Sequence, residues 1–265
     1  MNETAYAKIN LALHVRRRRE DGYHELETLF AFVDAGDELS VETAPRDELH
    51  VTGVFAPALS DPLGNIVAKA LGKLPRREGW RVTLDKRLPV AAGLGGGSVD
   101  AGAVFRLYDA RFGLPDDWRE RAARLGADVP ACVKSSTCIG RGTGIDLEPG
   151  PQDLAGTPVL LVNPRVPLAT GPVFAAWDGV DPGALPGGTA REIALAGRND
   201  LEAPALGLCP VIGKVLASLR DTSAWLVRMS GSGATCFALF ETSEHRDAVA
   251  EGLPREWWRL AGKLR

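Results

Sequence analysis

A stretch of the chain from Leu88 to Ala101 has residue types that suit phosphate binding. It contains four glycines in five positions, at 93, 95, 96 and 97. Glycine adopts positive φ without strain and lets backbone N–H groups come close to a ligand. Residues 99–107 follow with the spacing of a helix, whose N-terminus adds unpaired N–H groups and a positive dipole. We therefore interpret the stretch as a cradle for the phosphates of a nucleotide triphosphate.

Commoner uses of glycine-rich sequence fit this stretch less well. The Walker A string G-x-x-x-x-G-K-[ST] occurs nowhere in the chain. The dinucleotide pattern G-x-G-x-x-G fits at Gly93 and Gly95 but meets Ser98 at its last position, without a clear βαβ context. A flexible linker is the remaining alternative, although linkers rarely lie between an apolar strand and a helix.

A lysine and an amide share one face of the first predicted strand. From Ala5 to Val15, apolar residues alternate with Lys8, Asn10 and His14, and this period of two predicts a β-strand. Lys8 and Asn10 then lie roughly 7 Å apart on one face. That face is either solvated or presents both groups to a polar ligand.

A single carboxylate, Asp128, follows a predicted helix that ends at Leu125 with Gly126 as its cap. Pro130 disfavours the α region for the residue before it, which predicts that Asp128 lies on a rigid, non-helical segment. A structural aspartate in a turn is the ordinary interpretation.

The residues between the first two predicted strands are basic and aromatic. Arg16–Arg19 lead into Asp21-Gly22, which is a hairpin signal, so the arginines are interpreted as a solvated hairpin tip. Tyr23 and His24 follow at the entrance of the second strand. An aromatic ring next to an imidazole suits stacking and hydrogen bonding to a planar base, with ordinary packing as the alternative.

Composition limits the class of protein. A net charge of −3 argues against the overall basic field that drives nucleic-acid binding. The four cysteines form no C-x-x-C pair, which favours reduced, buried thiols. No apolar run reaches membrane-spanning length and the start lacks a signal-peptide pattern, so we expect a cytoplasmic protein that does not contact membranes. The Pro149-Gly150-Pro151 sequence predicts a linker between residues 1–150 and 151–265.

Taken together, these stretches resemble the GHMP kinases, the family of galactokinase and of homoserine, mevalonate and phosphomevalonate kinases. Pro89–Ala101 resembles the family's phosphate motif. Four further stretches are similar to a member whose substrate is a cytidine diphosphate-linked methylerythritol: Ala7–Leu11, Asp21–His24, Leu125–Pro130 and Ser230–Ala234. The resemblance extends from Ala5 to Phe240, which is nearly the whole chain.

The resemblance implies an α+β, two-lobed GHMP kinase fold. Residues 1–150 would form an N-terminal α/β lobe like the second domain of ribosomal protein S5, with a left-handed crossover. Residues 151–265 would form a ferredoxin-like C-terminal lobe, with the substrate between the lobes. It also implies that ATP with Mg²⁺ phosphorylates the 2-hydroxyl of the cytidyl substrate, in the non-mevalonate (MEP) pathway to isoprenoid precursors. The oligomeric state stays open between monomer and homodimer.

The resemblance also implies roles for individual residues. Lys8 and Asp128 would be the catalytic pair, because a tertiary alcohol needs help in losing its proton. Tyr23 and His24 would hold the cytosine, and other residues would border the same substrate: Asn10, Phe30, Thr170 and Phe174. ATP would be bound by the phosphate motif and by residues around its adenosine: Pro89, Val90, Ala91, Ala92, Gly93, Leu94, Gly95, Gly96, Gly97, Ser98 and Val99, with Asn65, Ile66 and Lys86. No metal-binding residue is assigned.

The chain departs from the family's motif at two positions. The family has a second serine where Val99 stands, so a hydroxyl contact to phosphate or Mg²⁺ is missing there. Gly102 replaces alanine and weakens a helix by roughly 1 kcal/mol. Three alternatives to the cytidyl kinase remain: a GHMP kinase for mevalonate, homoserine or a sugar, a nucleotide sensor without turnover, and a nucleic-acid binder.

Overall fold

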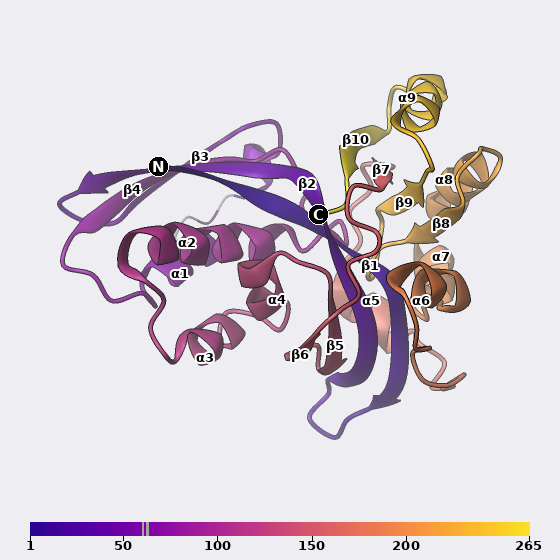
Figure 1. The fold of residues 1–265 in the computed structure, drawn as a ribbon, viewed down its shortest axis with the longest axis horizontal. Helices are drawn as coiled ribbons and strands as arrows, with labels where there is room; N and C mark the ends of the chain where they lie inside the picture. The colour runs from indigo at the N-terminus through magenta and orange to yellow at the C-terminus, as the bar shows by residue number, and fades with distance from the viewer. Residues whose placement is uncertain (60, 62–63) are drawn as a thin grey trace. The chain divides into compact units, whose positions relative to one another are not determined.

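The computed structural model describes residues 1–59, 61 and 64–265. These residues form two compact units, neither of which is a continuous segment (Figure 1). The first comprises Met1–Lys8, Ala35–Val90 and Gly95–Ser135, and the second comprises Ile9–Asp34, Ala91–Leu94 and Ser136–Arg265. Strands β1 (Asn2–Arg18) and β2 (His24–Ala44) therefore contribute one part to each unit. The predicted lobes, residues 1–150 and 151–265, divide the chain at a single point, whereas each compact unit is built from several segments. The lobe boundary near residue 150 therefore stays a prediction.

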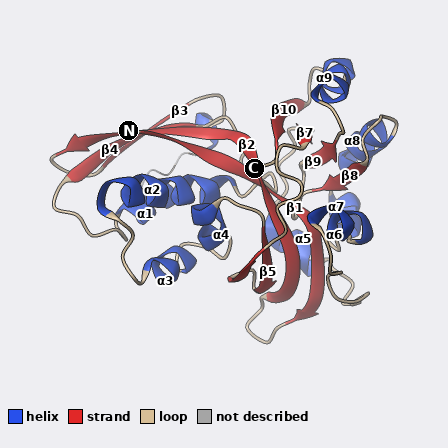
Figure 2. Ribbon diagram, viewed as in Figure 1, coloured by secondary structure: helices blue, strands red, loops and turns tan. Residues whose placement is uncertain are grey.

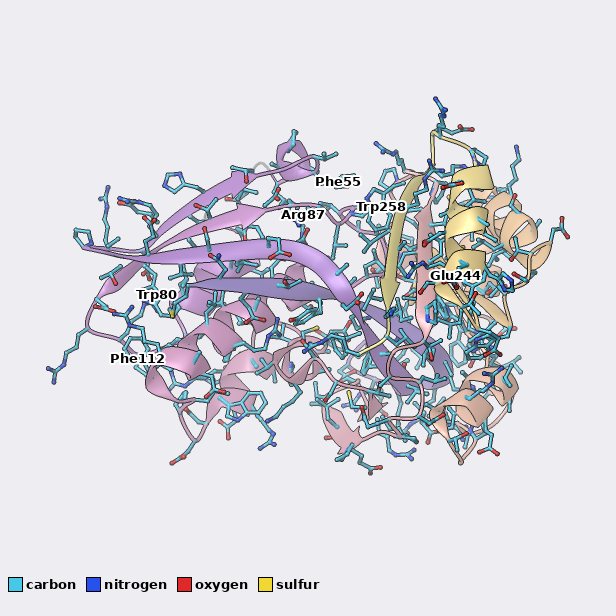
Figure 3. All side chains as sticks on the ribbon, turned by 45° about the horizontal axis from the view of Figure 1, so that its top comes forward. Phe55, Trp80, Arg87, Phe112, Glu244 and Trp258 are labelled. Atoms are coloured by element: carbon cyan, nitrogen blue, oxygen red, sulfur yellow. The ribbon has the colours of Figure 1, made fainter. Side chains whose placement is uncertain are left out.

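The first unit places helices on one face of a sheet (Figure 2). Its later strands are β3 (Glu48–Thr52) and β4 (Gly79–Asp85); β4 pairs with β3 in parallel and with the second part of β2 antiparallel. Its helices are η1 (Ala56–Ala58), α1 (Ile66–Leu71), α2 (Gly96–Phe112), α3 (Trp118–Ala123) and α4 (Val129–Lys134). Aromatic packing joins the two layers, because Trp80 of β4 stacks on Phe112 of α2 with ring centroids 6.0 Å apart (Figure 3).

The second unit contains the β1–β2 hairpin and a separate four-stranded sheet. Arg19 N–H donates to the carbonyl oxygen of Tyr23 (2.8 Å), which confirms the predicted hairpin. The first part of β2 pairs with β5 (Cys138–Gly142), and β5 pairs with β6 (Asp146–Pro149).

The four-stranded sheet of the second unit has the antiparallel strand order β10-β7-β9-β8. Its strands are β7 (Pro158–Asn163), β8 (Leu226–Met229), β9 (Cys236–Leu239) and β10 (Trp258–Lys263). Its helices are α5 (Thr170–Ala175), α6 (Ala190–Ala196), α7 (Glu202–Leu208), α8 (Val211–Arg220) and α9 (Ser243–Gly252). Helical segments lie between β7 and β8 and between β9 and β10. This β-α-β-β-α-β order confirms the expected ferredoxin-like arrangement.

The core of the second unit explains the apolar runs of its strands. Every residue of β7 is buried, which accounts for the continuous run Val159–Val162. Helix α8 packs its buried residues Ile212, Val215, Leu216 and Leu219 into one apolar cluster with residues of β7 and β9. All four cysteines are free and buried, as predicted.

Candidate active site

Lys8 and Asp128 form an ion pair within the first unit. Lys8 Nζ lies 2.9 Å from Asp128 Oδ2. The lysine side chain is only 5% exposed, whereas the aspartate is 31% exposed. The two residues are thus in direct contact, burial excludes the alternative of a solvated strand face for Lys8, and their catalytic role stays a prediction. A partly exposed carboxylate held by a buried cation can still meet a ligand.

Asp128 lies in a turn outside both neighbouring helices, as predicted, but Val129, the residue before Pro130, is helical. Asp128 directly precedes α4 and has helical dihedrals, φ −80° and ψ −15°, with Pro130 in the first turn. The first helical turn needs no N–H from proline, whose fixed φ already suits a helix there. This preference outweighs the restriction that proline places on the residue before it. Gly126 is likewise not the cap of α3, because α3 ends at Ala123 with Arg124 as its C-cap.

The glycine stretch opens helix α2, as predicted. Its N-cap is Gly95 with φ +67°, a conformation that glycine adopts without strain. The first helical hydrogen bond runs from Val99 N–H to Gly95 O. The N–H groups of residues 96–98 therefore have no acceptor within the helix. Gly97 is exposed and Val99 is buried. The helix thus presents three backbone donors and its positive end, while the valine side chain packs inside.

The start of α2 lies against both members of the ion pair. A Cβ atom built on Gly95 would lie 3.1 Å from Lys8 Cε. A Cβ atom built on Gly126 would lie 3.8 Å from Ser98 Oγ, and Gly126 belongs to the turn that leads into Asp128. A lysine, a carboxylate and a helix N-terminus are therefore gathered at one place in the first unit. This set can bind a phosphoryl group and accept a proton from its acceptor.

Two of the residues predicted near adenosine also adjoin α2. Asn65 caps α1 by accepting a hydrogen bond from Val67 N–H (2.9 Å). Ile66 contacts the glycine helix, since a Cβ atom on Gly97 would lie 3.1 Å from its Cγ2 atom. Neither contact tests whether the two residues bind a nucleotide, and their role stays a prediction.

Lys86 lies in a buried cluster that sequence reasoning did not identify. Its Nζ atom lies 2.5 Å from Asp37 Oδ2 and 2.6 Å from Asp100 Oδ2, and all three side chains are at most 3% exposed. Asp37 Oδ1 also accepts hydrogen bonds from the backbone N–H groups of Arg87 and Leu88. Burial raises the pKa of Asp100. Although burial opposes it, the two carboxylates raise the pKa of Lys86.

In the second unit, the serine–glycine turn at 230–234 holds the first part of the phosphate motif. Ser230 Oγ donates to Gly93 O (2.8 Å), and Thr235 N–H donates to Ala92 O (3.1 Å). A Cβ atom on Gly93 would lie 2.3 Å from Ser230 O, so only glycine fits there. From the sequence, this turn stood out only as a stretch that resembles the family, with no residue of it assigned to the site; its glycine spacing was the available signal.

Asn10 and Thr170 also contact this turn. Asn10 N–H donates to Ser230 Oγ (3.3 Å), while its side-chain amide donates to Thr28 Oγ1 (2.8 Å). Thr170 Oγ1 lies 3.0 Å from Ser232 Oγ. Asn10 is buried, so the alternative of a solvated strand face fails for it as well.

The predicted cytosine-binding residues of the second unit are unequally exposed. Tyr23 is 64% exposed, whereas His24 is buried beside Phe174, with ring centroids 4.9 Å apart. Burial and the neighbouring Arg18 lower the pKa of His24, which favours the neutral imidazole. Phe30 is buried and lies close to Gly140.

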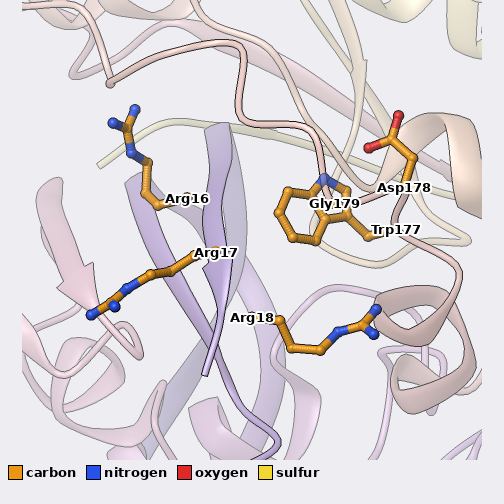
Figure 4. Close-up of a pocket in the computed structure, with 6 residues that line it drawn as sticks. All are labelled: Arg16, Arg17, Arg18, Trp177, Asp178 and Gly179. Carbon is orange, nitrogen blue, oxygen red and sulfur yellow. The ribbon is translucent and has the colours of Figure 1, made fainter. Parts of the chain in front are cut away.

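A pocket of about 280 Å³ lies in the second unit (Figure 4). One of its lining residues, Trp177, also contacts the ring of His24. It is lined by Arg16, Arg17, Arg18, Trp177, Asp178 and Gly179. Arg16 pairs with Asp181 and Arg17 with Glu25, so acidic neighbours offset much of the positive charge. Arg18 instead donates to His24 Nε2 (3.4 Å) and to the carbonyl oxygen of Ala175 (3.3 Å).

Among the described residues, no helix is long and apolar enough to cross a membrane. In the same part of the chain, no group of three or more His, Cys, Asp or Glu side chains could hold a metal ion.

Comparison with known proteins agrees with this fold. Residues 65–136 match the GHMP kinases N terminal domain, and residues 185–260 match the GHMP kinases C terminal domain. Fold and site thus define the class, that of the GHMP small-molecule kinases, which use ATP.

Full-length relatives identify the branch of that class. The chain is 73% identical over 265 residues to 4-diphosphocytidyl-2-C-methyl-D-erythritol kinase of Novosphingobium aromaticivorans, covering 100% of this chain and 93% of the relative. It is 60% identical over 271 residues to the kinase of the same name from Erythrobacter litoralis, with 100% and 99% covered. A crystal structure of 4-(cytidine 5'-diphospho)-2C-methyl-D-erythritol kinase superposes with a TM-score of 0.85 at 35% identity, covering 100% and 99%. The chain belongs to the family of 4-diphosphocytidyl-2-C-methyl-D-erythritol kinases.

Proposed function

We propose that this chain transfers the γ-phosphoryl group of ATP to the 2-hydroxyl of 4-diphosphocytidyl-2-C-methyl-D-erythritol, giving the 2-phosphate and ADP, in the non-mevalonate pathway to isoprenoid precursors. The family relation supports the substrate, because relatives 73% and 60% identical carry this name. One observation of the structure supports the chemistry: the Lys8–Asp128 pair lies at the N-terminus of α2, with the carboxylate partly exposed.

Each group at this position has a task in phosphoryl transfer. The 2-hydroxyl oxygen forms a bond to the γ-phosphorus while the bond from phosphorus to the β-phosphate oxygen breaks. Asp128 accepts the hydroxyl proton, and Lys8 offsets the negative charge on the transferring group. The N–H groups at the start of α2 bind phosphate oxygens. Because phosphoryl transfer has a loose transition state, positioning and electrostatics carry most of the rate enhancement.

Mg²⁺ would enter with ATP. Magnesium keeps several waters and is usually bound by one or two carboxylates together with phosphates of the substrate. Since Val99 has no hydroxyl, Ser98 is the motif residue that offers one to this ion or to phosphate.

Specificity for the cytidyl group would come from residues of the second unit. His24 is held neutral, so its ring and its backbone can hydrogen-bond a base edge, and Phe174 beside it offers an aromatic face. Tyr23 is exposed and free to stack on the base. Asn10, Phe30 and Thr170 would complete the substrate site. On the ATP side, Asn65, Ile66 and Lys86 would border the adenosine. We place the reaction in the cytoplasm, where four free thiols stay reduced.

The test is an acceptor panel with purified protein. ATP consumption is measured with Mg²⁺ and 4-diphosphocytidyl-2-C-methyl-D-erythritol, mevalonate or homoserine. Turnover only with the cytidyl substrate, and its loss in Lys8→Ala and Asp128→Ala, is expected. The exposed residues Lys214 and Asp116 supply matched controls, Lys214→Ala and Asp116→Ala, which should keep full activity. Turnover with another acceptor would overturn the substrate, and tight ATP binding without turnover would indicate a sensor.

A further inference from the structure

Arg106, in the middle of α2, is bonded to the strand that carries Lys8. Its Nη2 atom donates to Thr4 O (2.6 Å), and its Nε atom donates to Glu3 Oε1 (2.8 Å). The guanidinium carbon also lies 5.2 Å from the ring centroid of Tyr6. The three contacts tie α2 to the part of β1 that leads directly into Lys8.

The same guanidinium is bonded to the helix that carries Asp128. Its Nη1 atom donates to Cys132 O (2.6 Å) and to Ser135 Oγ (2.8 Å) at the C-terminal end of α4. Cys132 N–H in turn donates to the carbonyl oxygen of Asp128 (3.1 Å). The last carbonyl groups of a helix lack helical partners and favour a positive charge. Arg106 supplies both the donors and the charge at that end.

Close packing leaves little freedom between α2 and these two elements. A Cβ atom on Gly102 would lie 2.5 Å from Cys132 O, so α4 touches the α2 backbone one turn before Arg106. At the start of α2, Gly95 touches the side chain of Lys8 in the same way. The contacts at Gly102 fix the approach of α4, while the long side chain of Arg106 reaches both α4 and β1.

We propose that Arg106 is a positioning residue that holds β1 and α4 at the separation at which Lys8 and Asp128 meet. Its planar fork suits this task because its donors point to acceptors on different elements at once. Arg106 does not touch the ion pair itself; it acts through the Thr4 and Cys132 carbonyl groups. The inference rests on the proposed function, since its effect is measured in phosphoryl transfer.

The experiment compares Arg106→Met and Arg106→Lys with wild type in steady-state turnover of the cytidyl substrate. Displacement of a catalytic group by about 1 Å costs on the order of 10²-fold in rate. We expect a loss of kcat of that order for Arg106→Met, with KM for ATP and for the acceptor changed less than about 2-fold, because substrate contacts are untouched. Arg106→Lys keeps the charge but not the fork, and should recover part of kcat.

A matched control separates positioning from general stability. Arg76, in the same unit, is a buried arginine that donates to Leu71 O (2.6 Å) and Leu74 O (3.1 Å) and pairs with Asp47. Arg76→Met should lower the melting temperature and leave kcat near wild type at temperatures well below melting. Should Arg106→Met not fold, Ser135→Ala removes one acceptor and is expected to lower kcat severalfold. The proposal is overturned if Arg106→Lys, Arg106→Met or Ser135→Ala affects melting alone or raises KM at constant kcat. Loss of wild-type turnover would instead contradict the proposed function.

Discussion

Two lysines of the first unit are buried beside carboxylates, and they differ in what their partners can do. Lys8 Nζ pairs with Asp128, which is 31% exposed. Lys86 Nζ pairs with Asp37 and Asp100, which are almost completely buried. The first pair keeps a carboxylate that can reach a ligand. In the second set, all three side chains are buried, and the ammonium and carboxylate groups bond to one another rather than to a ligand.

The difference shows that burial of a lysine by itself does not identify a catalytic group. A buried charge needs compensation wherever it lies, because desolvation costs several kcal/mol per ion. What separates the two sites is the access of the partner carboxylate. Both lysines lie at the start of α2, since a Cβ atom on Gly95 would lie 3.1 Å from Lys8 Cε and one on Gly96 would lie 3.4 Å from Lys86 Nζ.

Replacing Lys8 sharpens the comparison most. Lys8→Met should lower kcat by about 10²- to 10⁴-fold, the range that a positioned acid–base or charge-stabilising group contributes. The free energy of unfolding should change little, since the partly exposed Asp128 can be solvated after the loss of its partner. Turnover and urea unfolding of the same preparation check both statements. A variant that lost stability and kept its turnover would make Lys8 a structural residue.

Replacing Lys86 should have the opposite signature. Lys86→Met leaves two carboxylates buried without a cation, and removing one partner of a buried ion pair costs about 3–5 kcal/mol. We expect the urea midpoint to fall accordingly while the fraction that stays folded keeps measurable kcat. Lys69, exposed on α1, provides the control Lys69→Met, which should unfold like wild type. Equal unfolding midpoints for Lys86→Met and wild type would contradict the described charge balance.

Local signals in the sequence predicted the elements of the site but not their contacts. The alternation around Lys8, the Asp21-Gly22 turn and the glycine start of α2 each depend on neighbouring residues, and all three are confirmed. The Lys8–Asp128 pair joins distant segments, and only the family resemblance predicted it. Nothing in the sequence pointed to Asp37, which reaches Lys86 across 49 residues.

The structure differs from two predictions that rested on neighbouring residues alone. Pro130 was expected to keep its neighbours out of a helix, yet it occupies the first turn of α4, where proline is accommodated. Gly102 was expected only to weaken α2. In the structure, Cys132 O of α4 occupies the space that a Cβ atom of Gly102 would need. The glycine lowers the helix propensity of α2, but its lack of a side chain is what allows close contact with α4, the helix that directly follows Asp128.

The smallest effect is expected at Asp100, where the closed cluster holds one more carboxylate than ammonium. Burial raises the pKa of Asp100, so the folded state binds a proton more tightly than the unfolded state does. The free energy of unfolding then falls as pH rises above about 3.8, the ordinary value, towards the folded pKa. Asp100→Asn removes this dependence and keeps the shape of the side chain. We expect its stability to be within about 1 kcal/mol of wild type near pH 4, and the difference to move in favour of the variant as pH rises. Urea unfolding of both proteins between pH 4 and pH 8 measures that difference. A difference that stays constant, or moves in favour of wild type, would mean that Asp100 is ionised in the cluster and that Lys86 balances both carboxylates.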